Sequence, residues 1–160
     1  MMTATNSTVG ERRELVITQV LDAPREVVFK AWIDPKQMAK WWGPKGFTNP
    51  VCEMDVRPGG ALRIVMRGPG RVDHPMTGVF CVIVEPERLV FTAVARDKQD
   101  NPLLESLTTV AFAKHGGKTK LTVQASAVGL APVAPQMLEG REAGWTQSLE
   151  RLANHVSRIG

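Results

Sequence analysis

A long amphipathic helix at the C-terminus constrains the fold more than any other feature of this sequence. Between residues 131 and 160, one set of side chains recurs at steps of three or four: Leu138, Arg141, Trp145, Leu149, Leu152 and Val156. This spacing places them on one helical face. The wetter side is expected to hold Glu139, Glu142, Glu150 and Arg151. A single helix cannot bury an apolar face alone, so this one has to lie against another layer.

The residues before this helix are patterned as strands separated by turn signals. A first strand is expected over residues 14–21, and six more over residues 47–56, 61–67, 75–85, 88–96, 103–114 and 118–127. The last six are joined by short connections rich in Pro, Gly and Asn, which favour antiparallel neighbours. Alternation is clearest in the last strand, where Leu121, Val123 and Ala125 share a face. Between residues 75 and 85 both faces are apolar, so alternation does not choose the inward one.

Two short helices are expected between the first strand and the rest. Asp22 is a candidate cap for the first, which carries an apolar stripe over residues 27–32. Pro35 suits the start of the second, and Gly43 with Pro44 ends it. The expected fold is therefore α+β, with a seven-stranded antiparallel sheet curled around one long helix. We expect a loose tail over residues 1–12 and one domain over residues 13–160, with room for a ligand between sheet and helix.

Composition is that of an ordinary globular protein. The 160 residues include 43% hydrophobic and 22% charged side chains, and the net charge is +4. The basic residues are scattered without a long run, so we favour a solvated surface over nucleic-acid binding. The polar N-terminus and the absence of a long apolar run predict no signal peptide and no membrane span, hence a cytoplasmic protein. Cys52 and Cys81 fit no zinc or redox spacing, and buried reduced thiols are favoured over a disulfide.

Several motifs together resemble one protein family. They are APREVVFKAWIDPKQMAKWWGP (residues 23–44), DVRPGGALRIVMRGPG (55–70), TGVFCVIVEPERLVFT (77–92) and GWTQSLERLANHV (144–156). They resemble the branch of the START and birch-pollen-allergen-like helix-grip superfamily (SRPBCC) that is named after the activator of heat-shock protein 90 ATPase, the AHSA-like domains. The resemblance covers about residues 14–157. It implies a helix-grip fold and either hydrophobic ligand binding or a stress-response partnership with heat-shock protein 90. Cyclase- or hydrolase-type enzymes also occur in the superfamily.

A hydrophobic small molecule, such as a lipid, polyketide or aromatic compound, is the expected ligand. The expected cavity lining is Trp41, Trp42, Leu62, Ile64, Met66, Phe80, Phe91, Phe112, Met137, Arg141 and Trp145. Four of these have alternatives. At least one ring of the Trp41–Trp42 pair is expected to anchor the short helix, and Trp145 is equally compatible with ordinary core packing. Arg141 either binds a ligand carboxylate or phenolate, or extends its charge to solvent at the helix edge.

Other reactive patterns are weak. Glu53 and Asp55 share a strand face and are candidates for acid–base work, although exposed strand carboxylates are far commoner and Asp55 is favoured as a residue that shapes the following turn. The three histidines, His74, His115 and His155, lack metal-ligand spacing, and a hairpin explains the glycines at residues 116–117 better than a phosphate loop does. We therefore expect no metal and no cofactor, and leave catalysis open. A monomer or a homodimer is expected.

Overall fold

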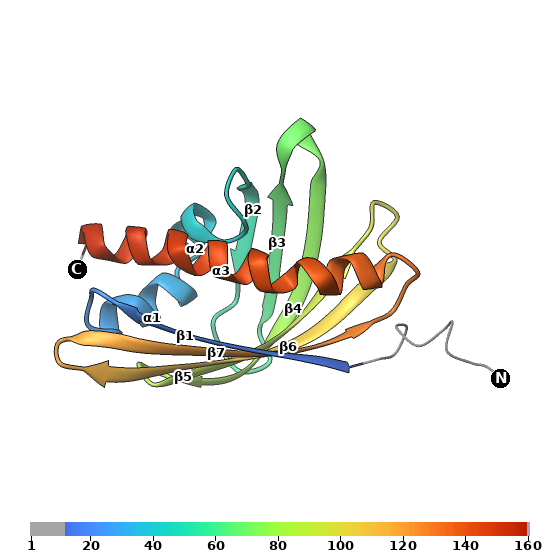
Figure 1. Cartoon of the computed structure of the whole chain (residues 1–160). Coiled ribbons are helices and arrows are strands. Elements are labelled where there is room, and N and C mark those ends of the chain that lie inside the picture. Colours follow the sequence, from blue (N-terminus) through green and yellow to red (C-terminus); the bar gives the residue numbers. More distant parts are fainter. Residues whose placement is uncertain (1–11, 160) are drawn as a thin grey trace.

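The computed structural model, which describes residues 12–159, shows one strongly curved antiparallel sheet with a long helix lying across its concave side (Figure 1). Strand order in the sheet is β1-β7-β6-β5-β4-β3-β2. The elements are β1 (Arg12–Leu21), α1 (Arg25–Ile33), α2 (Pro35–Trp41), β2 (Thr48–Met54), β3 (Ala61–Arg67), the 3-10 turn η2 (Pro69–Arg71), β4 (Asp73–Val84), β5 (Arg88–Arg96), β6 (Pro102–His115), β7 (Lys118–Gly129) and α3 (Ala134–Ile159). The α+β helix-grip prediction is confirmed.

Helix ends follow the local sequence with one exception. The carboxylate of Asp34 accepts a hydrogen bond from the Lys36 backbone N–H at 3.0 Å and so caps α2, with Pro35 as its first residue. Asp22 does not cap α1, because the residue at the cap position is Pro24 and no side chain bonds there. The tail expected over residues 1–12 lies outside the described residues except for Arg12, which begins β1.

The inward side chains of β5, β6 and β7 differ in size along the strands. Two neighbouring rows across the sheet carry large side chains: Leu89, Val110 and Val123 in one, Phe112 and Leu121 in the next. The rows beyond them carry mostly small ones: Phe91, Thr108 and Ala125, then Ala93, Ser106 and Ala127. We call the first two rows the packed end of the sheet and the other two the hollow end.

The packed end is covered by α1 and by the C-terminal half of α3. Phe29 of α1 lies against Phe112, with ring centroids 4.9 Å apart. Leu149, Leu152 and Val156 of α3 are fully buried in the same cluster. The predicted helical face therefore forms the core here, while Met137, Arg141 and Trp145, in the N-terminal half of α3, face the hollow end.

A bulge explains why β4 looked apolar on both faces. Pairing with β5 shifts register between Phe80 and Val82. Before the bulge Phe80 points inward and is 1% exposed, while Val79 is 42% exposed. Beyond it, Ile83 packs against the core and Val84 is 46% exposed. One extra residue moves the inward set by one position, so inward side chains fall on both sequence parities.

The same bulge corrects the expectation for one cysteine. Cys81 sits at the bulge and is exposed, so it is not a buried thiol. Cys52 is half-buried, and burial, with smaller contributions from Asp34 and Glu53, raises the pKa of its thiol to about 11. Both cysteines are free.

Candidate functional site

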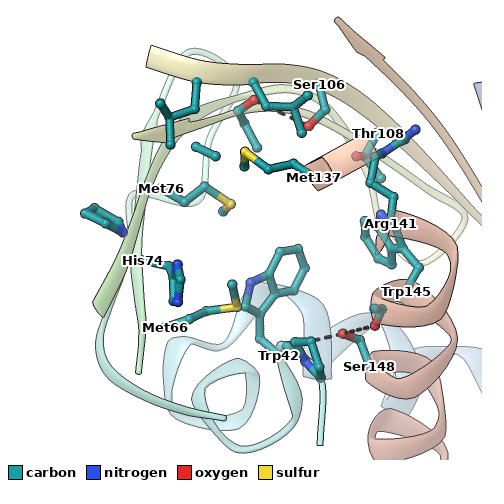
Figure 2. A pocket seen from close by; sticks show the side chains of 18 of the residues that line it. Trp42, Met66, His74, Met76, Ser106, Thr108, Met137, Arg141, Trp145 and Ser148 are labelled. Carbon is teal, nitrogen blue, oxygen red and sulfur yellow. Dashed lines mark hydrogen bonds between the residues drawn. The ribbon is translucent and has the colours of Figure 1, made fainter. Parts of the chain in front are cut away.

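A cavity of about 280 Å³ lies between the hollow end of the sheet and α3 (Figure 2). Its apolar lining comes mainly from Trp42, Met66, Met76, Phe91, Met137 and Trp145. Small side chains on β5 and β6, among them Ala93, Ala95 and Ser106, form its floor. The volume is near the lower end of the roughly 300–1,000 Å³ typical of small-molecule sites. Large side chains at the packed end keep α3 at a distance from the sheet. Small side chains at the hollow end do not fill that distance, so a cavity remains there.

Aromatic packing fixes the two indoles that line the cavity. Trp32, fully buried beneath them, stacks on Trp145 with centroids 6.3 Å apart and meets Trp42 edge-on at 6.5 Å. Trp42 and Trp145 themselves meet edge-on at 5.5 Å. Such contacts add roughly 0.5–1.5 kcal/mol per pair beyond area burial. The two rings are therefore held in place before any ligand arrives.

The segment that carries Trp42 is also fixed from α3. One guanidinium nitrogen of Arg151, Nη1, donates to the carbonyls of Trp42, Gly43 and Pro44 at 2.9–3.1 Å. Its Nη2 donates to the Lys40 carbonyl at 3.0 Å, near the end of α2. Arg151 is thus half-buried and does not lie on the wetter side as expected. Ser148 adds a second tie by accepting from the Gly43 N–H at 3.1 Å and donating to the Gly144 carbonyl at 2.9 Å.

Arg141 and Thr108, both in the lining, keep unused hydrogen-bonding capacity. Arg141 donates one hydrogen bond, from Nη2 to the Ala125 carbonyl at 3.1 Å, and makes no ion pair with another described residue. Thr108 is 1% exposed, and its hydroxyl has no hydrogen-bond partner among residues 12–159. By contrast, Arg96 is engaged with Thr77 at 2.9 Å and with the Asp100 carbonyl at 3.1 Å.

Burial lowers the pKa of Arg141 from its ordinary value. Glu14 opposes this shift, and Arg13 adds to it. A guanidinium has so high an intrinsic pKa that it stays charged. Arg141 is therefore a half-buried cation of the cavity that forms no ion pair with the residues described by the structure.

The structure divides the predicted lining into two groups. Trp42, Met66, Phe91, Met137, Arg141 and Trp145 line the cavity. Trp41, Leu62, Ile64, Phe80 and Phe112 do not; they are buried in the core instead. Trp41 anchors α2, because its indole N–H donates to the Ala31 carbonyl at 3.0 Å.

Sequence reasoning missed the small and polar members of the lining. Ala93, Ser106, Thr108 and Ser148 were not among the predicted residues, since large apolar side chains were taken as the mark of a cavity. The alternation in β5 and β6 could have found the first three. It puts Ala93 and Ala95 on the face of Phe91, and Ser106 and Thr108 on the face of Val110.

The acid–base candidates lie away from the cavity. Glu53 pairs with Arg63 at 3.6 Å, and Asp55 pairs with Arg57 at 2.7 Å. All four side chains are at least half exposed. Among the described residues, no carboxylate lines the cavity and no group of His, Cys, Asp and Glu is arranged to hold a metal ion. His74 lies in the lining as an exposed residue, and His155 contacts Gln37 of α2 at 3.0 Å.

Comparison with known proteins identifies the family. The family model described as activator of Hsp90 ATPase homolog 1-like protein matches residues 22–157. The chain belongs to this family. A comparison with curated proteins found no significant match.

Solved structures share the fold over nearly the whole chain. A protein from Chromobacterium violaceum is 31% identical, with a TM-score of 0.77 over 89% of this chain and 96% of that one. A protein from Rhizobium leguminosarum is 27% identical, with a TM-score of 0.78 over 92% and 96%. The AHSA1 protein from Silicibacter pomeroyi is 22% identical, with a TM-score of 0.75 over 92% and 100%. The last similarity supports the fold alone. Within residues 12–159, no helix has the length and apolar character needed to cross a membrane.

Proposed function

We propose that this AHSA1-like chain, folded as one domain over residues 13–160, binds a small, mostly apolar molecule in the cavity between the hollow end of the sheet and α3. The observation that carries the proposal is the preformed cavity. Its two indoles are held by Trp32, and its methionines offer flexible, polarizable side chains that adapt to a ligand surface. Burial of apolar ligand surface contributes roughly 25 cal/mol per Å² before the costs of association.

The test is a fluorescence titration with the neutral probe N-phenyl-1-naphthylamine. We expect saturable binding with one site per chain. Trp145→Ala removes one side of the cavity, so it should weaken binding by about tenfold, equivalent to about 1.4 kcal/mol. Leu107→Ala is the matched control, because Leu107 lies on the outer face of β6 and is 44% exposed. Equal affinities for wild type and Trp145→Ala, or an effect of Leu107→Ala instead, would contradict the cavity assignment.

The natural ligand requires a different experiment. Native mass spectrometry of protein purified from its own cells, together with a solvent extract of the same sample, should show a stoichiometric adduct that is released on denaturation. Cytoplasmic extracts are the appropriate source under this proposal.

The family match supports a second function, binding to heat-shock protein 90 in a stress response. A pull-down with the purified chaperone tests it. Capture that survives Trp145→Ala would separate a partner surface from the cavity, and the absence of capture would remove this alternative.

A further inference from the structure

One polar region of the cavity is built from two elements that the fold brings together. Arg141 of α3 bonds the Ala125 carbonyl, and Ala125 of β7 is the register partner of Thr108 in β6. Arg141 is thereby held beside Thr108, and the close-up view shows its side chain extending from the helix toward that residue (Figure 2). Both residues line the cavity.

Both groups present hydrogen-bond donors that the protein leaves unused. The Arg141 guanidinium carries five N–H groups, and one hydrogen bond, to Ala125, is made with the described residues. Thr108 is 1% exposed, and its hydroxyl makes no hydrogen bond with residues 12–159. Buried polar groups are almost always satisfied by protein, water or a ligand. The Arg141 guanidinium and the neighbouring Thr108 hydroxyl can both donate to one acceptor group of a ligand. A negatively charged acceptor complements the guanidinium best.

We propose that the ligand of this cavity is an amphipathic anion, whose carboxylate- or sulfonate-type head group binds Arg141 and Thr108 while its apolar body lies among Trp42, Met76 and Met137. This inference rests on the proposed function and specifies its ligand class. Arg96, the other cation of the lining, is not the head-group site. Its side chain bonds Thr77 and the Asp100 carbonyl and lies 3.7 Å from the Asp100 carboxylate.

Two probes with one scaffold separate head-group recognition from apolar binding. They are 8-anilinonaphthalene-1-sulfonate, the anionic probe, and N-phenyl-1-naphthylamine, the neutral probe, which lacks the sulfonate. Titrations at about 0.15 M salt limit long-range attraction by the net positive charge. We expect wild type to bind the anionic probe more tightly. Arg141→Gln should weaken the anionic probe by about tenfold and change the neutral probe by less than about twofold, as for loss of a partly exposed charged hydrogen bond.

Three further variants make the test specific. Thr108→Val keeps the side-chain shape and should weaken the anionic probe by about threefold. Arg141→Lys keeps the charge without the planar fork and should give an intermediate affinity. Arg158→Gln removes an equal charge from an exposed position on the same helix and should change neither probe.

The outcomes distinguish this inference from the proposed function. If the neutral probe binds and Arg141→Gln leaves the ratio of the two affinities unchanged, the head-group site is wrong and apolar binding stands. If Arg158→Gln lowers anionic affinity as much as Arg141→Gln does, general charge attraction replaces the proposed site. Arg96→Gln, titrated in the same way, should leave anionic affinity unchanged; an equal loss in that variant would place the head group at Arg96. If neither probe binds wild type, both proposals fail. Retained neutral-probe affinity in each variant shows that the cavity is intact.

Discussion

The packed end and the hollow end of the sheet belong to the same strands and face the same helix, yet they have opposite roles. At the packed end, Phe112 lies against Phe29, and Phe112 and Leu121 belong to one buried cluster with Leu149, Leu152 and Val156 of α3. At the hollow end, Ala93 of β5 and Ser106 and Thr108 of β6 face a cavity of about 280 Å³. A change in side-chain size along β5 and β6, with little change in backbone, therefore separates stability from binding.

The largest effect expected from this comparison is a difference between two leucine truncations. Leu121→Ala at the packed end should lower the free energy of unfolding by about 3–5 kcal/mol, because Leu121 is fully buried and leaves a void. Leu104→Ala at the hollow end should cost about 1 kcal/mol, since Leu104 is half-buried and already borders the cavity. Urea denaturation of the two variants measures both. If the two variants lose free energies of unfolding that agree within about 0.5 kcal/mol, the distinction between the packed and the hollow end is wrong.

Filling the cavity with a larger side chain should change stability less than the leucine truncations do, and should weaken ligand binding strongly. Ala93→Leu points into the cavity, so it should change the free energy of unfolding by less than about 1 kcal/mol and weaken the neutral probe by at least about tenfold. In α1, which covers the packed end, Ala31→Leu adds the same atoms to a fully buried position and should cost roughly 1–3 kcal/mol by overpacking. Thermal unfolding and the probe titration test the pair. Strong destabilisation by Ala93→Leu would mean that the hollow end is as tightly packed as the other.

The contrast between the packed and the hollow end also explains which parts of the structure could be predicted from the sequence. Periodicity placed Leu149, Leu152 and Val156 on one buried face, and short turns implied the antiparallel sheet; the structure confirms both. These features depend on polarity patterns that repeat along the chain. The cavity depends on side-chain volume summed over β3, β4, β5, β6, α3 and the loop after α2, so Phe80 and Phe112 were assigned to it although they fill the core.

Local sequence patterns also could not predict contacts between segments that are far apart in the chain. The bonds from Arg151 to the carbonyls after α2 cross more than a hundred residues of sequence. The bulge at Cys81 shifts the inward face of β4 by one position and gives no signal in an evenly apolar strand. Thr108 shows the same limit, because a threonine in a strand is ordinary until the fold places it beside Arg141.

The smallest predicted effect is a pH dependence confined to the packed end. His155 lies in the C-terminal part of α3, and its Nε2 is hydrogen-bonded to Oε1 of Gln37 in α2 at 3.0 Å. Burial first, then Lys40 and Arg158, lowers the pKa of His155 below its ordinary value of 6.5, while Asp34 opposes this. The unfolded chain therefore takes up a proton at higher pH than the folded chain does. The stabilisation from neutral His155 is present above about pH 6.5 and is lost as pH falls below it toward the folded-state pKa.

Urea midpoints for wild type and His155→Gln between pH 7.5 and 5.5 measure the pH-dependent stabilisation from His155. We expect wild type to lose more stability on acidification than His155→Gln, which lacks the titrating group. Because His155 is partly exposed, solvent screening keeps the difference small. Affinity for the neutral probe, whose site lies at the other end of α3, should change equally with pH in both proteins. A pH-dependent affinity that disappears in His155→Gln would show instead that the two ends are coupled through α3, and the division between a packed and a hollow end would not hold for binding.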